Sequence, residues 1–94
     1  MPFASDQAQV LGLEAVTWLA GNDELLPIFL GSTGAGLEDL RAGISDPAMH
    51  GAVLDFILMD DAWVQQMCNA LSLSYETLAQ ARAALPGGAN VHWT

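Results

Sequence analysis

The sequence predicts an all-α fold, a compact bundle of five or six helices, on three observations. Apolar residues recur at helical spacing along most of the chain. Good N-cap residues such as Asp46, Asp60 and Ser74 stand before several of these segments. Turns that contain glycine or proline separate the segments. With 94 residues, the chain is expected to form one domain with a short N-terminal arm and a flexible tail from about residue 88.

The first predicted helix runs from Ser5 or Asp6, either of which can cap it, to about Ala20. Glu14 and Thr17 are expected to face water. Its predicted core face consists of Ala8, Leu11, Ala15, Trp18 and Leu19.

Two shorter helices follow. The apolar residues of Leu25–Leu30 predict one, whose start is uncertain because Pro27 is tolerated only near the first turn. The glycine-rich run 31–36 is expected to end it as a turn, because no strand precedes the run and no lysine follows for a phosphate. A third helix over residues 37–44 is expected to carry Leu40 into the core.

Residues 47–59 form the most apolar stretch and predict the helix against which the others pack. Asp46 can cap it, and Pro47 suits the first helical position because its missing N–H would have no partner there. His50 and Asp55 are its main polar interruptions. Its predicted core face consists of Met49, Ala52, Val53, Phe56 and Ile57.

Two more helices are expected after the central one. Asp60 can cap a helix that ends near Leu71, and after a turn at residues 72–74 a sixth helix begins at Ser74 and stops at Pro86. Their predicted core residues are Val64, Met67, Cys68, Leu71, Leu78, Ala81, Arg82 and Leu85.

Composition limits the class of partner. Hydrophobic residues make up 52% of the chain and charged residues 14%, so the chain is too apolar to be disordered and some apolar side chains should stay exposed. Eleven acidic residues stand against Arg41 and Arg82, for a net charge of −9. Nucleic acids and anionic membranes need basic groups, so we expect neither as a partner. The acidic excess favours solubility or a basic protein partner.

The chain offers no set of residues typical of a catalytic or metal site. Cys68 is the single cysteine, which excludes an intrachain disulfide, and its apolar neighbours predict a buried, unreactive thiol. His50 and His92 lie far apart in the sequence, and His50 is expected on the surface. We therefore expect no metal, no cofactor and no small-molecule ligand, and we expect that the chain is not an enzyme.

Asp55 stands among apolar residues of the central helix, so its carboxylate must reach solvent or find a donor. Arg41 or Arg82 could be that donor, and a structural ion pair is expected rather than an active-site acid. The N-terminus lacks a secretory signal, and the apolar run 52–59 is far shorter than the about 20 residues that a bilayer needs. A cytoplasmic location is expected.

A shift of 38 residues superimposes the apolar pattern on itself, placing Leu11 on Met49 and Trp18 on Phe56. Identities are few, so a true duplication of two three-helix halves and a chance match both stay open. Each half also contains a short helix, a tight turn and a second short helix, as in a helix-turn-helix. Each candidate recognition helix, however, offers a single arginine beside acids, whereas base readout needs several Arg, Lys, Asn or Gln side chains.

The stretch VLDFILMDDAWVQQMCNALSLSYETLAQARAALPGG carries a resemblance to a known family. LDFIL is followed by Asp60 and Asp61, Cys68 stands eight residues after Asp60, and a start of the form L-S-x-E-x-L precedes the ALPGG stop. Over roughly residues 10–88 the chain resembles a family of small, uncharacterised bacterial proteins known only as a domain of unknown function. The resemblance implies a small all-helical domain and no particular activity, cofactor or catalytic residue.

Leu54, Leu58 and Trp63 form the predicted partner-binding site. The helix face defined above closes the core without Leu54 and Leu58, and Trp63 lies at the edge of the next helix's apolar face. If the three converge, they form an exposed apolar patch with an aromatic anchor and acidic neighbours. The alternative, that all three are buried, stays open.

The sequence therefore predicts a non-catalytic, acidic, helical module that acts through protein contacts, with another protein or with a second copy of itself. A helix-turn-helix regulator acting on nucleic acid is the alternative, and an enzyme is the third possibility.

Overall fold

The computed structural model describes residues 5–85, and within that range it contains six α-helices and no strand. The predicted all-α fold is confirmed. The predicted C-terminal tail lies outside the described residues. The helices are α1 (Ser5–Ala20), α2 (Leu25–Thr33), α3 (Leu37–Ala42), α4 (Pro47–Leu58), α5 (Asp61–Leu71) and α6 (Tyr75–Ala84).

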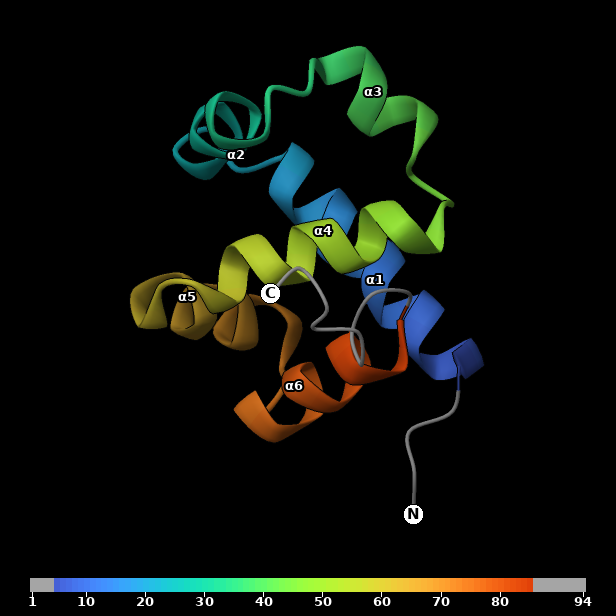
Figure 1. Ribbon diagram of the computed structural model, residues 1–94. Coiled ribbons are helices and arrows are strands. Elements are labelled where there is room, and N and C mark those ends of the chain that lie inside the picture. Colours follow the sequence, from blue (N-terminus) through green and yellow to red (C-terminus); the bar gives the residue numbers. More distant parts are fainter. Residues whose placement is uncertain (1–4, 86–94) are drawn as a thin grey trace, which may run out of the picture.

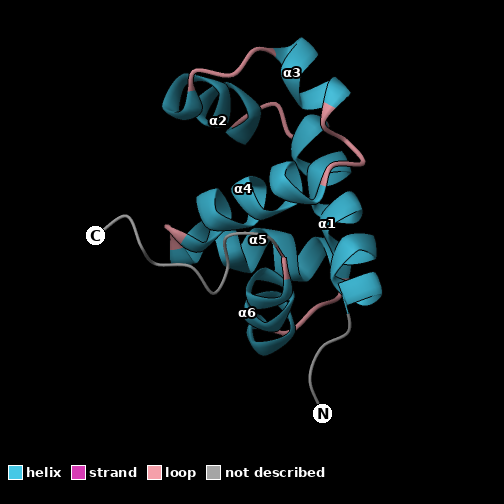
Figure 2. Cartoon of the chain, turned by 45° about the vertical axis from the view of Figure 1, so that its right-hand side comes forward, coloured by secondary structure: helices cyan, strands magenta, loops and turns pink. Residues whose placement is uncertain are grey.

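The pair α1 and α4 forms the centre of the molecule (Figure 1). Helix α6 packs mainly on α1, and α5 packs mainly on α4. Helices α2 and α3 lie together at the opposite end from α6, as both ribbon views show (Figures 1 and 2). None of the described helices is long and apolar enough to cross a bilayer.

Side-chain caps begin three helices where the sequence predicted them. Asp46 and Asp60 each accept a hydrogen bond from the backbone N–H two residues later, at 3.0 and 2.8 Å. Ser74 accepts one from the backbone N–H three residues later, at 3.1 Å. Each bond satisfies a backbone donor that the first helical turn leaves without a partner, so these starts are encoded locally.

Helix α2 is longer than predicted. It continues through Gly31 to Thr33, and the turn begins only at Gly34, whose φ of 77° ends the helix in the left-handed region. The Thr33 hydroxyl donates to the Phe29 carbonyl oxygen at 2.8 Å. This bond satisfies an oxygen in the last turn, and glycine at position 31 lowers helix propensity without forbidding the conformation.

The core face of α4 is rotated from the predicted one. Its fully buried stripe is His50, Val53, Leu54 and Ile57, which has the i, i+3, i+4, i+7 spacing of a helix. The predicted face was therefore partly wrong, because Ala52 is exposed and Met49 is only half-buried. Half of the residues of this helix are nevertheless buried, as expected of the central element.

Gly12 of α1 explains the rotation. A Cβ at this position would lie 2.5 Å from the His50 Cβ, closer than real atoms approach, so only glycine leaves room for the imidazole. The small residues Ala8 and Ala15 are also fully buried on this face of α1. Together the three small residues let α4 come close to α1.

His50 is buried, with 2% of its surface exposed, and the prediction of a surface histidine was wrong. Its Nε2 lies 2.7 Å from the Ile44 carbonyl oxygen. Because a carbonyl only accepts, Nε2 carries the proton and donates it. The Nδ1 atom is buried without a hydrogen-bond partner and lies against Gly12. The imidazole therefore ties the loop before α4 to the core.

Aromatic rings join three helices. The rings of Phe29 in α2 and Phe56 in α4 meet edge to face, with centroids 5.2 Å apart. On its other side Phe56 stacks on Trp63 of α5, with centroids 4.6 Å apart. Such pairs add about 0.5 to 1.5 kcal/mol beyond the area they bury, so they hold α2 and α5 against α4.

Several features recur at the predicted spacing of 38 residues. Among residues 5–85, positive φ angles occur at Gly34 (77°) and Ser72 (58°), which are 38 positions apart. The helices that follow begin at Gly36 and Ser74, again 38 apart. The packing is less symmetric, because α6 packs closely on α1 whereas α3 does not pack comparably on α4. The duplication itself stays a prediction.

Candidate functional site

The predicted partner-binding residues Leu54, Leu58 and Trp63 do not form an exposed patch. Leu54 is fully buried, so its expected exposure was wrong; the rotation of α4 turns it toward the core. Leu58 and Trp63 are half-buried and pack against the core, and Trp63 is covered on one face by Phe56. Whether any partner touches Leu58 or Trp63 stays a prediction.

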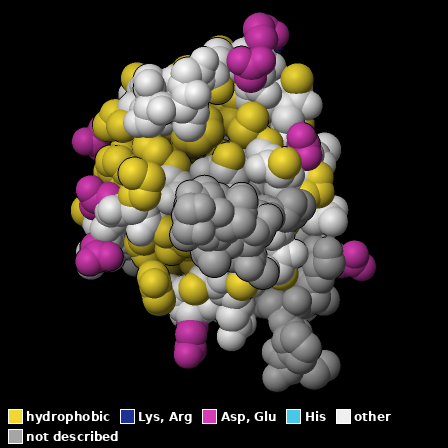
Figure 3. Space-filling view, viewed as in Figure 1, with side chains coloured by type: hydrophobic (Ala, Val, Ile, Leu, Met, Phe, Trp, Pro, Cys, Tyr) yellow, Lys and Arg dark blue, Asp and Glu magenta, His cyan; other side chains and the backbone are white. Residues whose placement is uncertain are grey.

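Figure 3 shows where half-buried side chains of this kind reach the surface. Hydrophobic side chains gather on the face where α2, α4 and α5 meet, and acidic side chains stand around its edge. No basic side chain of the described residues is visible on that face. This face is apolar but is largely part of the packing between helices.

The outer face of α1 exposes larger apolar side chains. Val10 is 61% exposed and Leu13 is 41% exposed. They are three residues apart, so they are neighbours on one side of the helix, and Thr17 continues the row by another turn. Asp6 and Glu14 flank the row. We call these five residues the α1 surface.

Two hollows border the α1 surface on the side of α5 and α6. The larger, of about 430 Å³, lies beside Leu13, between α1 and the end of α5. Its walls are mainly apolar and consist of Leu13, Glu14, Thr17, Trp18 and Leu71. The smaller, of about 340 Å³, lies beside Val10 and reaches Leu73 and Thr77. The two hollows share Glu14, so they follow α1 as consecutive parts of one groove.

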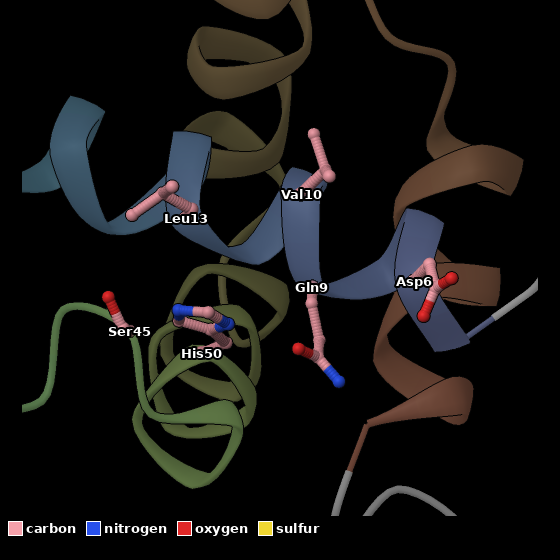
Figure 4. A pocket seen from close by; sticks show the side chains of 6 residues that line it. All are labelled: Asp6, Gln9, Val10, Leu13, Ser45 and His50. Carbon is pink, nitrogen blue, oxygen red and sulfur yellow. The ribbon is translucent and has the colours of Figure 1, made fainter.

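A third hollow, of about 260 Å³, borders the same residues on their other side (Figure 4). Gln9 and His50 lie across it from one another, Ser45 lies next to His50, and Asp6 lies at the end. Val10 and Leu13 line this hollow and also the groove, so they form a ridge between two depressions. Among the described residues, no group of three or more His, Cys, Asp or Glu could hold a metal ion.

The charges near the ridge are acidic. Asp6 and Glu14 carry the charged side chains that line its hollows. Arg82 binds Asp55 on the far side of the core, and Arg41 lines a separate hollow between α1 and α3. The α1 surface therefore combines an apolar centre with a negative border.

Asp55 and Arg82 form the predicted ion pair. The Arg82 Nε donates to Oδ1 of Asp55 at 2.5 Å, and Nη2 donates to Oδ2 at 2.7 Å. Arg82 is buried, whereas the Asp55 side chain is 53% exposed. The bidentate geometry fixes α6 against α4. The prediction of a structural pair with one of the two arginines is confirmed.

Cys68 is half-buried rather than buried. Its burial raises the pKa of the thiol above the ordinary value, because an apolar environment disfavours the charged thiolate. The predicted inertness has a physical basis, although the predicted degree of burial was too high.

The α1 surface escaped the sequence analysis because the predicted core face of this helix accounted for most of its apolar residues. Val10 and Leu13 were the remainder, and they are three positions apart. Two large apolar residues at helical spacing but off the core face were the signal in the sequence.

Comparison with known proteins gives one match. The profile of a family described as Protein of unknown function (DUF3572) matches residues 5–88. The search of curated proteins and the search of solved structures found no match. The resemblance to an uncharacterised all-helical family is thereby confirmed.

Proposed function

We propose that this chain, which belongs to the family described as Protein of unknown function (DUF3572), is a non-catalytic module that binds another protein. The exposed ridge of Val10 and Leu13, with hollows on both sides, carries the proposal. Large apolar side chains grouped on a surface are typical of interaction sites.

The arrangement of α1 supports the proposal. Its inner face, including Ala8, Ala15 and Leu19, is fully buried in the core, so the outer face stands on a rigid support. A partner that binds such a preformed surface loses little free energy to ordering it. An apolar centre with a charged border is also the usual composition of a protein interface.

In-cell crosslinking tests the proposal. A photo-reactive amino acid replaces Thr17 on the α1 surface in one variant and Ile28 on α2 in another, and both positions are exposed. We expect a specific crosslinked protein at position 17, and we expect its yield to fall at least about tenfold when Leu13→Ser is added. Circular dichroism checks that each variant is folded.

Ile28→Ser serves as the matched control for Leu13→Ser, because both side chains are 41% exposed and both lie in helices. It should leave the crosslink at position 17 unchanged. A crosslink that forms equally at both positions, or that ignores Leu13→Ser, would count against an interface on α1.

A regulator that binds nucleic acid through a helix-turn-helix is the second candidate function. The α5–α6 pair supports it by its topology, but Arg82 is buried and paired with Asp55. At physiological salt we expect negligible affinity for duplex DNA, because phosphate binding depends on exposed basic groups. Saturable, sequence-specific binding in a gel-shift assay would favour this candidate. Turnover of any substrate, which no cluster of described residues supports, would favour an enzyme.

We also propose a bacterial, cytoplasmic protein built from two halves related by 38 residues. The resemblance in sequence supports the first part, and the equal spacing of Gly34 and Ser72 supports the second. Fractionation of cells that make the protein tests its location. Relatives whose two halves are more alike in sequence would test the duplication.

A further inference from the structure

Resting on the proposed function, we infer that the α1 surface binds a basic amphipathic helix of a partner protein. The ridge, the groove beside it and the negative border each specify one property of that partner.

The shape of the site fits a helix. The groove follows α1 from Asp6 to Trp18, a length of about 18 Å at 1.5 Å per residue. A partner helix of about three turns covers that length. It would place apolar side chains at i, i+3 or i+4 and i+7 along the groove. The hollow between Trp18 and Leu71 is the larger and more apolar part, so it receives the largest of these side chains.

The secondary structure of the site favours a helix over an extended peptide. A peptide that binds as an added strand needs the free edge of a sheet, and residues 5–85 contain no strand. A ridge of side chains on a helix instead offers the kind of surface into which a second helix packs.

Charge specifies a basic partner. Glu14 lies in the middle of the groove, and Asp6 lines both the groove and the hollow beside His50. Lysine or arginine side chains at the flanks of the partner helix can reach both carboxylates. In the hollow beside His50, the carboxylate of Asp6 and the side-chain oxygens of Gln9 and Ser45 offer acceptors to such a group.

A second copy of this chain is a poor occupant. The chain carries a net charge of −9, and two α1 surfaces brought face to face would place Asp6 and Glu14 of one copy near the same acids of the other. Like charges at an interface oppose association. The same carboxylates favour a cationic helix, and the interaction should weaken as salt screens them.

Peptide binding tests the inference. The probe is a fluorescent synthetic peptide of about 15 residues with leucines along one helical face and lysines on its flanks. One comparison peptide has the same composition in scrambled order, and another has glutamates in place of the lysines. We expect the basic amphipathic peptide to bind the full chain at least about tenfold more tightly than either comparison peptide, by fluorescence anisotropy.

Substitutions locate the binding. Leu13→Ser should weaken binding about tenfold, whereas Ile28→Ser, at equal exposure, should change it less than about twofold. Glu14→Gln should weaken binding a few-fold at low salt, and this effect should vanish at about 0.5 M salt. Glu38→Gln on α3 is its matched control. Amide chemical shifts should change along α1 and around Leu71 and Leu73.

Three results would overturn the inference: equal binding of the acidic peptide, equal binding of the scrambled peptide, or shift changes confined to α2 and α3. Dimerisation that Leu13→Ser abolishes would make a second copy the occupant. Shifts along α1 that change when Trp93→Ser is introduced, without peptide, would make the chain's own C-terminal segment the occupant. Either result would also overturn it.

The two proposals can fail separately. If the basic peptide does not bind but the crosslink at position 17 still depends on Leu13, the partner class is wrong and the interaction module stands. If that crosslink is also absent, both proposals fail.

Discussion

The contact between Gly12 and His50 sets how closely α1 and α4 approach. At this contact an added methyl group would meet Cβ, Cγ and Nδ1 of the imidazole within 2.7 Å. His50 cannot move away freely, because its Nε2 is bonded to the Ile44 carbonyl oxygen. The position therefore tolerates no side chain without a shift of a helix.

We predict that Gly12→Ala destabilises the fold by about 1 to 2 kcal/mol. Overpacking costs about 1 to 3 kcal/mol, and a smaller gain in helix propensity offsets part of it. Gly31→Ala is the control, because a Cβ there meets nothing within 4 Å, and it should stabilise the fold by about 0.5 to 1 kcal/mol. Urea unfolding measures both. Equal effects of the two substitutions would contradict the close contact.

Cys68 gives a prediction about pH. Burial raises the pKa of its thiol, so at a given pH a smaller fraction is present as the reactive thiolate than in an unfolded chain. Alkylation of the folded protein by iodoacetamide should be slower than in urea. Its rate should keep rising with pH beyond the ordinary pKa of a cysteine. A rate that levels off below that pKa would show a thiolate stabilised by its surroundings.

At the scale of the helix, the turns after α2 and α5 invite comparison. Both reverse the chain through a residue in the left-handed region, which is Gly34 in the first turn and Ser72 in the second. Glycine adopts this conformation without steric cost, whereas a residue with a Cβ loses about 1 kcal/mol or more. The second turn is therefore strained and the first is not.

We predict that Ser72→Gly raises the free energy of unfolding by about 0.5 to 1 kcal/mol, because it relieves this strain. Gly34→Ser should lower it by a similar amount. Thermal unfolding followed by circular dichroism measures both changes. A loss of stability in Ser72→Gly would mean that the serine side chain contributes more than its backbone costs.

Helices were predictable where local chemistry specifies them. The caps Asp46, Asp60 and Ser74 act within two or three residues of themselves, and each starts a helix as expected. The rotation of α4 was not predictable in this way, because it depends on a glycine 38 positions earlier in the chain. Both His50 and Leu54 were misplaced for this single reason.

The candidate site was harder to predict than the fold. The chain contains more apolar residues than its core needs, and spacing along one helix does not say which of them a neighbouring helix will cover. Leu54 was expected outside and is inside, whereas Val10 at 61% exposure lies outside on a helix read as mostly core and polar. Only the packing of α6 and α4 around α1 decides between them.

For the whole molecule, charge is the dominant constraint. A net charge of −9 is held within a radius of gyration of 12.3 Å, so acidic side chains lie closer together in the folded state than in the unfolded chain. Repulsion among them opposes folding. The ion pair of Asp55 with Arg82 offsets only a small part of it.

We predict that the midpoint of thermal unfolding rises by a few degrees when sodium chloride increases from about 0.02 M to about 0.3 M, because salt screens this repulsion. Potassium chloride should act equally, since the effect depends on ionic strength. A midpoint that falls with salt would show that attractive charge pairs outweigh the repulsion.

Helix α1 has an inner face that contacts α2, α4, α5 and α6 and an outer face that is open. A molecule that binds the outer face while the chain is folded loses its site when α1 detaches, and detaching α1 removes the support of every helix packed on it. Binding energy at this one surface is therefore added to the cooperative stability of the entire domain. A simple melting-temperature shift can thus serve as a screen for ligands, with Leu13→Ser as the insensitive counterpart.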